Sequence, residues 1–408
     1  MTHQGEAGLA PAAGHARPRS RTVALDKLGV VIAAIAAGAA LWAPFATFRA
    51  NRIVAGQAMP LLDALPRPDG LVLVAVIAAA ALAALLRTPA WLRLSASIAA
   101  LAVLLLVIGA AAAHLTPAGN SYARVSPASG FWLLLFAFAL LAADALTRLD
   151  LPPLSRLAAL AAAALAVGLI LWSGRWDGLS IMKEYANRAD TFRAEAGKHV
   201  VLALGSLAAA AAAGLPLGIL CHRVPRLRDG VLNLLNMVQT IPSIALFGML
   251  IAPLGWIAAH VPGASAIGIS GIGTAPAFVA LFLYSLLPVV ANTVVGLAAV
   301  PPAANDAARG VGMTGRQRLL GVELPLAFPV ILTGIRIVLV QNIGLATIAA
   351  LIGGGGFGVF VFQGIGQTAM DLVLLGAVPT VALAFASAIV LDAVIEMASA
   401  HPSKGAAA

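Results

Sequence analysis

The chain has 408 residues, of which 61% are hydrophobic and only 10% are charged. A soluble globular domain is about 45–50% apolar and about 25% charged, so this composition excludes a soluble fold and places most of the chain in lipid. The formal net charge of +9 indicates basic cytoplasmic loops and not nucleic-acid binding, because no basic helix or aromatic stacking motif accompanies the charge.

A membrane-spanning helix needs about 20 mostly apolar residues, and ten stretches of the chain fit that pattern. We therefore expect an all-α, polytopic protein with about ten spans. Residues 1–27 precede the spans, are rich in Gly, Ala, His and Arg, and are expected to form a disordered cytoplasmic tail. The spans of an N-terminal membrane region, 28–173, are expected at 28–47, 70–86, 94–114, 130–147 and 154–173.

Residues 174–198 are the longest polar interruption of the chain. We expect a linker or amphipathic helix on the outer face there, dividing the chain into two membrane regions. The second region is expected over 199–398, followed by a cytoplasmic tail over 399–408. Its spans are expected at 199–221, 231–255, 276–299, 327–352 and 373–397.

The basic residues predict the orientation. If the N-terminus is inside and the spans alternate, 15 of the 25 Lys and Arg residues fall in inside segments and 9 in outside segments. This bias predicts that both termini are cytoplasmic. Arg336 falls within a span, where it is expected to snorkel to the cytoplasmic interface, the alternative being a functional buried charge. One cysteine and scattered histidines predict neither a disulfide framework nor a metal site.

The loop between the eighth and ninth spans, residues 301–329, is unusual for a membrane protein. Pro301 and Pro302 are expected to stop the preceding helix, and Asn305 or Asp306 to cap a new one. Glycines then break this helix, and a second short amphipathic helix follows before Pro325 marks the return to the membrane. Such a helix–turn–helix on the cytoplasmic face suits docking of another protein, because a push on it moves both attached spans.

The runs DAARGVG and VELP within this loop resemble the coupling motif of ABC importer permeases. The matching residues are Asp306, Ala307, Ala308, Gly312, Val322, Leu324 and Pro325. Asp306 and Val322 are conservative departures from the Glu and Ile of the family motif. The resemblance implies that the loop 301–325 docks into a groove on a separate ATPase, with Ala307 and Ala308 keeping the contact face thin.

Three further stretches, 237–250, 280–297 and 346–358, resemble permeases for quaternary ammonium osmoprotectants such as glycine betaine, choline and carnitine. The resemblance covers about 200–398 and implies an ABC type I importer permease fold in the bacterial inner membrane. It also implies a cytoplasmic ABC ATPase that binds ATP and Mg, a second permease that is the same or a related chain, and a periplasmic or lipid-anchored substrate-binding protein. No cofactor is expected in this chain, and residues 1–198 resemble the extension of a long form.

Polar residues of the seventh and eighth spans are candidates for the translocation path. They are Gln239, Thr240, Pro242, Tyr284, Asn292 and Thr293. Pro242 predicts a kink, which is either a hinge or a break satisfied by Ser243. Tyr284 attracts a quaternary ammonium through its ring or packs as an interfacial anchor, and Asn292 either lines the path or bonds between helices.

A glycine-rich run closes the ninth span at its outer end. Its members Gly353, Gly354, Gly355 and Gly356 are expected to break the helix and to allow close packing, with a gate as the alternative. The run is not a nucleotide-binding loop, because no Lys-Ser/Thr follows it.

The sequence predicts a non-catalytic transport subunit, and several alternatives stay open. An ABC permease for another small solute, such as an amino acid, would have the same coupling loop. A secondary transporter is expected to carry acidic residues at mid-membrane, whereas Asp144 and Asp392 lie near span ends. A membrane-embedded enzyme would need a cluster of reactive residues at membrane depth, and none is evident. A further alternative concerns only residues 1–198, which would form a regulatory or assembly module and not part of the translocation path.

Overall fold

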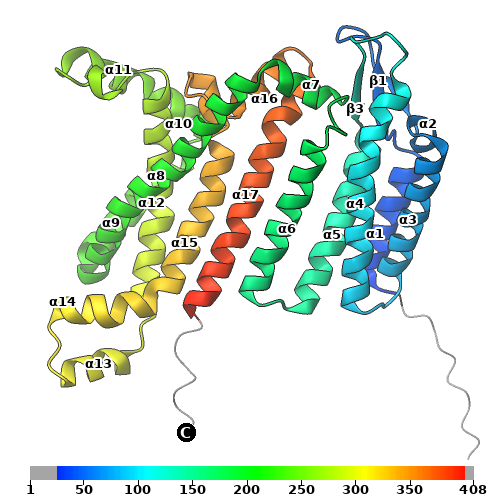
Figure 1. Cartoon of the computed structure of the whole chain (residues 1–408). Coiled ribbons are helices and arrows are strands. Elements are labelled where there is room, and N and C mark those ends of the chain that lie inside the picture. The colour runs from blue at the N-terminus through cyan, green and yellow to red at the C-terminus, as the bar shows by residue number, and fades with distance from the viewer. Residues whose placement is uncertain (1–24, 400–408) are drawn as a thin grey trace, which may run out of the picture.

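The computed structural model describes residues 25–399, whose long helices stand side by side in one slab (Figure 1). Nine helical segments of this described part, with Ser243–His260 counted as one, are long and apolar enough to cross a membrane, and the shorter apolar helix α1 runs beside them. This confirms the predicted all-α, polytopic membrane fold. The expected tails, 1–27 and 399–408, lie almost entirely outside the described residues.

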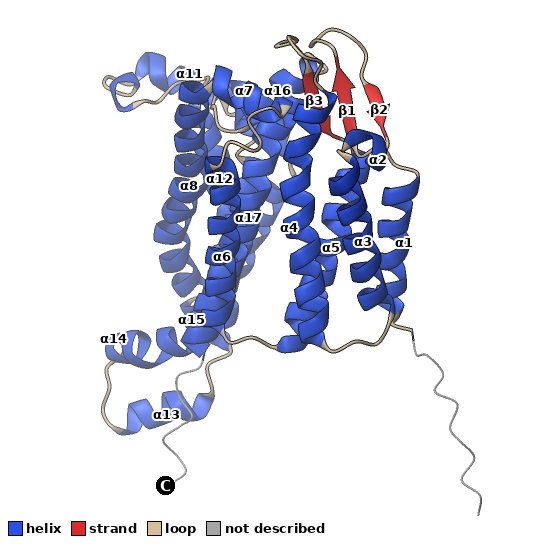
Figure 2. Cartoon of the chain, turned by 45° about the vertical axis from the view of Figure 1, so that its right-hand side comes forward, coloured by secondary structure: helices blue, strands red, loops and turns tan. Residues whose placement is uncertain are grey.

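The chain alternates direction through the slab, so the start of α1 and the end of α17 lie at the same face. That face also carries α13 and α14 and is called the loop face; the opposite face carries a small β-sheet and is called the sheet face (Figure 2). The helices of the slab are α1 (Lys27–Leu41), α3 (Arg67–Leu85), α4 (Ala90–Leu115), α5 (Ser129–Leu149), α6 (Pro153–Trp172), α8 (Ala189–Arg223), α9 (Pro225–Thr240), α10 (Ser243–Met249), α12 (Thr274–Ala298), α15 (Leu324–Leu345) and α17 (Met370–Ser399).

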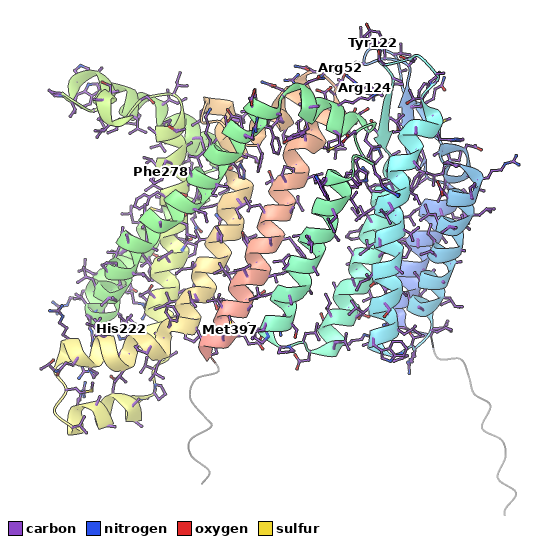
Figure 3. All side chains as sticks on the ribbon, in the orientation of Figure 1. Arg52, Tyr122, Arg124, His222, Phe278 and Met397 are labelled. Carbon is purple, nitrogen blue, oxygen red and sulfur yellow. The ribbon has the colours of Figure 1, made fainter. Side chains whose placement is uncertain are left out.

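Short elements lie at the two faces. Tyr122 and Arg124 lie at the sheet face and His222 near the loop face (Figure 3). The loop face carries α13 (Pro302–Gly310), α14 (Gly315–Arg318) and the π-helical turn η2 (Leu319–Glu323). The sheet face carries β1 (Ala46–Arg49), β2 (Gln57–Met59), α2 (Leu61–Ala64), β3 (Arg124–Pro127), α7 (Ser180–Asn187), α11 (Ile251–His260), the 3₁₀ turns η1 (Ser265–Ile267) and η3 (Ile348–Ile352), and α16 (Gly358–Gly366).

The small sheet corrects the first predicted span, 28–47. Helix α1 ends at Leu41, and the chain enters β1 at Ala46. Pro44 lies between them and has no backbone N–H with which to continue the helix. The strand order is β2–β1–β3, with both pairings antiparallel. These short strands carry no long alternating pattern, which is why the sequence predicted helix only.

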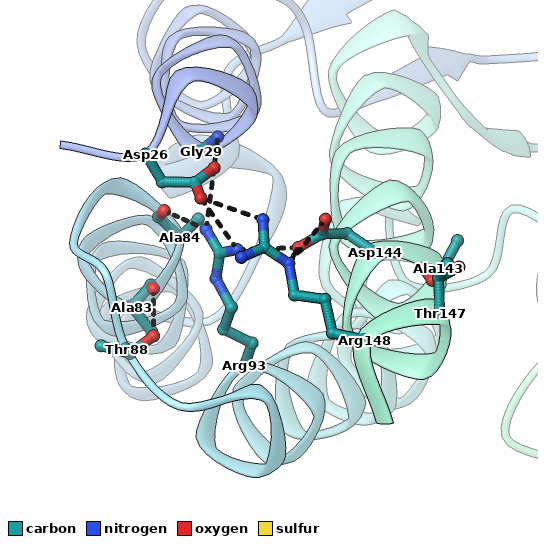
Figure 4. A network of polar contacts seen from close by, with 10 residues as sticks. All are labelled: Asp26, Gly29, Ala83, Ala84, Thr88, Arg93, Ala143, Asp144, Thr147 and Arg148. Atoms are coloured by element: carbon teal, nitrogen blue, oxygen red, sulfur yellow. Dashed lines mark hydrogen bonds and ion pairs between the residues drawn. The ribbon is translucent and has the colours of Figure 1, made fainter. Parts of the chain in front are cut away.

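Helices α1, α3, α4 and α5 pack into an N-terminal bundle that encloses a network of charged residues near the loop face (Figure 4). Arg93 of α4 is fully buried and lies 2.7 Å from Asp144 and 3.2 Å from Asp26. It also donates to the carbonyl oxygen of Ala84 at 2.6 Å. Arg148 reaches the same two carboxylates at 2.9 Å each. The network therefore joins α1, α3, α4 and α5.

Asp26 also caps α1, since its carboxylate accepts the backbone N–H of Gly29 at 2.8 Å. Burial alone would raise the pKa of Asp26, but hydrogen bonds from Gly29, Arg148 and Arg93 outweigh it and lower the pKa to about 2. Ionised Asp26 therefore stabilises the bundle at pH values above its ordinary pKa of 3.8. That contribution is lost as the pH falls from there through 2.

The second region, hereafter the core, is built from α8, α12, α15 and α17. Small residues let these helices approach closely. A Cβ on Gly218 of α8 would lie 2.5 Å from Thr293 of α12, and one on Gly334 of α15 would lie 2.7 Å from Asn292 of α12. The contacts of α12 with both neighbours therefore depend on glycine.

The centre of the core holds uncharged polar groups. Asn342 of α15 donates to the hydroxyls of Ser206 on α8 and Ser285 on α12, both at 2.9 Å. All three side chains are buried. Hydrogen bonds of this kind hold helices together in lipid, where no water competes for the polar groups. Neither the trio nor its register was predicted from the sequence.

The predicted sixth and seventh spans require correction. Helix α8 begins at Ala189, ten residues before the expected start at 199. Together with α7 it makes most of 174–198 helical, a segment expected as a linker or an amphipathic helix. The seventh span, expected as one helix over 231–255, is instead α9 followed by α10, with a break at Ile241 and Pro242. Pro242 has no N–H to continue α9. Beyond α10, helix α11 turns aside at the sheet face (Figure 1).

The N-terminal bundle and the core are joined by α6 and α7. Helix α6 packs against α17 and buries none of its own residues, and Arg156 of α6 lies 3.0 Å from Glu396 of α17. At the sheet face, α7 lies between β3 and the start of α17. The two regions thus share a junction along α17.

Candidate functional site

The predicted docking loop forms a helical hairpin at the loop face (Figure 2). Its first helix, α13, begins at Pro302, whose missing N–H is not needed at a first helical position. The prediction that Asn305 or Asp306 caps this helix is therefore wrong, because both lie inside it. The Asp306 side chain is exposed and lies 3.7 Å from Arg309.

Gly312 closes α13 with a Schellman motif. Its φ of +80° lies in the left-handed region, the Gly312 N–H donates to the Arg309 carbonyl at 2.9 Å, and the Met313 N–H donates to the Ala308 carbonyl at 3.0 Å. A Cβ on Gly312 would meet no atom within 4 Å. Glycine is therefore favoured here by backbone conformation and not by crowding.

The second helix of the hairpin is α14, which starts with a capping box. The Thr314 hydroxyl accepts the Gln317 N–H at 3.3 Å, and the Gln317 side chain accepts the Thr314 N–H at 2.8 Å. A π-helical turn, η2, then leads into α15. The sequence suggested a separate short helix that ends before Pro325. In the structure, the second helix of the hairpin is instead continuous with α15. Turns of the π type occur frequently at functional sites.

Glu323 is a residue that sequence reasoning missed. It lies in η2, is 3% exposed, and pairs with Arg223 at the end of α8 at 2.5 Å and with Arg318 of α14 at 3.0 Å. The carboxylate thus ties the hairpin to α8, which is far away in sequence. A charged residue between the apolar Val322 and Leu324 was the available signal.

The matched motif residues differ in exposure. Ala307 is exposed with Asp306, but Ala308 is 6% exposed and faces into the hairpin. The prediction that both alanines keep the outer face thin is therefore wrong for Ala308. Val322 and Leu324 are half-buried and Pro325 is exposed. The exposed part of the hairpin combines small or apolar residues, Ala303, Ala307, Gly310, Val311 and Gly312, with charged and polar ones, Asp306, Arg309, Arg316 and Gln317.

The break in the seventh span is held by the eighth. The Gln239 side chain donates to the Tyr284 carbonyl at 2.8 Å. The Tyr284 hydroxyl in turn donates to the carbonyl of Ile241, directly before Pro242. Tyr284 is 5% exposed, so its hydroxyl satisfies a carbonyl freed by the break. The structure brings these predicted path residues together.

The other predicted path residues lie apart from this break. The Thr240 side chain bonds the Met237 carbonyl in its own helix. The Asn292 side chain donates to the Pro288 carbonyl at 2.8 Å, and the Thr293 hydroxyl to the Val289 carbonyl at 2.7 Å. Thr293 is fully buried against Gly218. Asn292 and Thr293 therefore serve the packing of α12.

The glycine-rich run follows α15 at the sheet face. Helix α15 ends at Leu345, η3 follows, and the chain then turns through residues with positive φ at Gly353, Gly355 and Gly356. Glu195 of α8 accepts the Gly356 N–H at 2.7 Å. A Cβ on Gly355 would lie 2.5 Å from the Glu195 carboxylate, and one on Gly354 would lie 2.9 Å from the Ala349 carbonyl. The run is thus a helix break packed closely against α8.

The sequence suggested that the Arg336 side chain snorkels to the interface without a partner, and the structure differs. Arg336 forms an ion pair with Asp392 of α17. The two charges lie on neighbouring helices, and pairing within a membrane offsets part of the cost of burying each.

Two families of known proteins match separate parts of the chain. Residues 26–182 match the N-terminal domain of the ABC transporter permease YehY. Residues 214–400 match the binding-protein-dependent transport system inner membrane component. A chain of the MetNI methionine ABC transporter in an inward-facing form has 21% sequence identity and a TM-score of 0.46, covering 52% of this chain and 98% of that chain.

Several relatives are similar over the core. The osmoprotectant import permease protein OsmW of Salmonella typhimurium is 44% identical over 195 residues, which are 48% of this chain and 84% of OsmW. The carnitine transport permease protein OpuCB of Listeria monocytogenes is 36% identical, covering 46% of this chain and 78% of that protein. The glycine betaine/carnitine/choline transport system permease protein OpuCB of Bacillus subtilis is 35% identical, covering 49% of this chain and 82% of that protein. The chain therefore belongs to the binding-protein-dependent transport system inner membrane components, the permeases of ABC transporters.

Proposed function

We propose that this chain is the permease subunit of an ATP-driven importer and that the hairpin 301–325 docks on its ATPase. The observation that carries this proposal is the hairpin itself, which projects from the loop face and is joined directly to α12 and α15 (Figure 2). Its exposed surface includes the small residues Ala303, Ala307, Gly310 and Gly312, where another protein can approach closely. With the loop face in the cytoplasm, the start of α1 and the end of α17 lie there as well.

The hairpin would move three helices together. Helices α12 and α15 are its covalent neighbours, and the Glu323 pair with Arg223 adds α8. These three helices surround the buried trio of Asn342, Ser206 and Ser285. ATP binding and hydrolysis in the ATPase would shift the hairpin and thereby alternate the path between outward-open and inward-open states.

The remaining parts of the transporter are proposed from the family. The ATPase would bind ATP and Mg, so this chain would need no cofactor of its own. A second permease, identical or related, would complete the path. A periplasmic or lipid-anchored binding protein would deliver the substrate at the sheet face, to which the break at 353–356 belongs.

The proposed substrate is a small quaternary ammonium osmoprotectant such as glycine betaine, choline or carnitine. Its support is the set of relatives named for these solutes, at 35–44% identity over most of their length. An ABC permease for another small solute, such as an amino acid, is the second candidate. A transporter driven by an ion gradient is the third.

The coupling proposal is tested in vesicles that contain the complete transporter, by ATP-dependent uptake of labelled glycine betaine. Gly312→Val forces a β-branched residue into the left-handed region and should abolish uptake while the protein stays in the membrane. Gly230→Val is the matched control, because Gly230 is exposed in α9 and a Cβ there meets nothing within 4 Å. Normal uptake by the Gly312 variant would contradict the coupling role.

The same vesicles separate the candidate functions. Excess choline or carnitine should compete with labelled glycine betaine, and amino acids should not. Uptake that an ionophore abolishes, but that survives ATP depletion, would instead indicate a secondary transporter.

A further inference from the structure

Two arginines face each other across the small sheet. Arg49 of β1 and Arg124 of β3 are directly opposite in the antiparallel register, and Figure 3 shows Arg124 at the sheet face. Both are half-buried, and the Nε atom of each is buried without a hydrogen-bond partner among the described residues. Like charges directly opposite on a sheet destabilise it. A negatively charged group bound next to the two arginines would therefore stabilise the sheet.

Further basic residues surround this pair at the junction with α7. Lys183 donates to the Ala123 carbonyl at 2.9 Å, and its pKa is lowered by burial and then by the charge of Arg124. Arg52 and Arg188 share the buried carboxylate of Glu184, at 3.7 and 3.6 Å. Glu184 is thus already paired with two other cations.

One other carboxylate lies close to the arginine pair. Asp371, in the first turn of α17, is 7% exposed and close enough to Arg49 and Arg124 to interact electrostatically, but it forms no ion pair within 4.0 Å in the described part of the chain. Its Oδ1 atom is likewise unpartnered there. The cluster therefore contains five basic side chains (Arg49, Arg52, Arg124, Lys183 and Arg188) and two acidic ones (Glu184 and Asp371), and its excess charge is positive.

A groove of about 530 Å³ opens beside this cluster. Its polar side is formed by Arg49, Ser126 and Ser129, and its apolar side by Trp132 of α5 with Met370 and Leu374 of α17. The groove thus lies between the N-terminal bundle and the core, where α5 and α17 both begin at the sheet face. One end offers hydrogen-bond donors and positive charge, and the other offers apolar surface.

The helix between these two regions provides a continuation of the apolar side. Helix α6 stands between α5 and α17 (Figure 1), packs on α17 and buries none of its residues. Its apolar surface away from α17 is therefore free to contact acyl chains in a bilayer. Trp132 lies at the level of the sheet face, where tryptophan is favoured at membrane interfaces.

We propose that this groove binds a membrane phospholipid at the junction of the two regions. Arg49, Ser126 and Ser129 hold its phosphodiester, and Arg124 adds positive field. The acyl chains run from the groove along Trp132 and Leu374 towards α6. Guanidinium groups suit phosphate because they offer paired N–H donors in one plane. The apolar residues that line the same groove, Trp132, Met370 and Leu374, favour a lipid over a free anion.

The test measures phospholipid retained by the full chain after purification in a phosphate-free detergent, by native mass spectrometry and phosphorus assay. The double variant Arg49→Gln/Arg124→Gln should retain at least about tenfold less, because it removes hydrogen bonds to a charged group. Arg175→Gln/Arg193→Gln is the matched control, with the same charge change at exposed positions of the sheet face, and should retain the wild-type amount. Equal retention by both double variants overturns the proposal.

A second variant keeps the test independent of the arginines. Leu374→Trp fills the apolar side of the groove without changing charge and should also displace the lipid, whereas unchanged retention overturns the proposal.

The source of the phosphate is decided with delipidated protein. Phosphatidylglycerol nanodiscs should raise its unfolding temperature more than nanodiscs of a phosphate-free glycolipid. An equal rise with inorganic phosphate alone would show a free-anion site and overturn the lipid assignment.

Discussion

The buried centres of the N-terminal bundle and of the core are held together by different kinds of polar interaction. The bundle encloses two arginines and two aspartates in a network whose central residue, Arg93, is fully buried. The core encloses the uncharged trio around Asn342 and helix contacts made through glycine. Its ion pair between Arg336 and Asp392 is more exposed, at 33% and 44% of the two side chains. Breaking a buried ion pair is costly, whereas hydrogen bonds between helices in lipid contribute about 0.6 kcal/mol on average.

This difference indicates that the two regions differ in how easily their helices shift. A charged network with several partners fixes one arrangement of helices, because any shift leaves a charge unpaired. Weak hydrogen bonds and smooth glycine contacts allow packed helices to slide by small amounts. We therefore expect the bundle to act as a rigid body and the core to change shape. The ion pair of buried Glu323 with the more exposed Arg223 lies at the loop face of the core, where the ATPase would push.

The largest effect is expected from Arg93→Ala. It leaves Asp26 and Asp144 without their buried partner and should destabilise the bundle by about 3–5 kcal/mol. Five of the six tryptophans precede residue 180, whereas the one cysteine, Cys221, is buried in the core. Thermal unfolding followed by tryptophan fluorescence should therefore shift strongly, while the temperature at which Cys221 becomes reactive should change little.

The control for this experiment is Arg67→Ala, which removes an exposed arginine from α3. It should leave both signals unchanged. If Arg93→Ala shifts the two signals together, the bundle and the core unfold as one unit, and the comparison between them fails.

The second effect is expected from Glu323→Gln. The loss of a carboxylate bonded to Arg223 and Arg318 should destabilise the hairpin attachment by about 1.5–3 kcal/mol and reduce ATP-dependent uptake. Glu396→Gln is the control, because Glu396 pairs with Arg156 at a more exposed position of the same face. Uptake that falls equally in both variants would show that Glu323 has no special part in coupling.

The sequence predicted the parts of the fold that follow from local patterns. Apolar runs located the long helices, and the prolines and glycines of 301–325 located the hairpin. The break at Ile241 and Pro242 was visible as a proline, but its consequence was not, because the Tyr284 hydroxyl that satisfies the broken helix lies 43 residues away. Local patterns cannot show which distant group satisfies a carbonyl.

Most of the pairings that the sequence did not reveal are of this long-range kind. Asn342 and Ser206 are 136 residues apart, and Arg223 and Glu323 are 100 residues apart. The β-strands were missed because they are only three or four residues long. The motif match located Val322 and Leu324 but ignored the variable position between them, although that position holds the buried carboxylate.

A third, smaller effect is expected from Asn342→Ala. It removes the hydrogen bonds to Ser206 and Ser285 and should destabilise the core by about 0.6–1.7 kcal/mol. Cys221 should become reactive at a slightly lower temperature, with the tryptophan signal unchanged. Ser399→Ala is the control, since Ser399 is exposed and bonds only within its own helix. A loss as large as that of Arg93→Ala would refute the contrast between a charged, rigid bundle and a weakly bonded core.

The smallest effect is expected from Arg148→Gln, which separates burial from charge within the bundle. Arg148 contacts the same two carboxylates as Arg93, but its side chain is 44% exposed and that of Arg93 is 1% exposed. Exposed ion pairs contribute at most about 1 kcal/mol, and Arg93 still neutralises both aspartates when Arg148 is gone. The tryptophan transition should therefore move far less than in Arg93→Ala. Because the two substitutions remove the same charge from the same carboxylates, equal shifts would mean that charge count, and not burial, holds the bundle together.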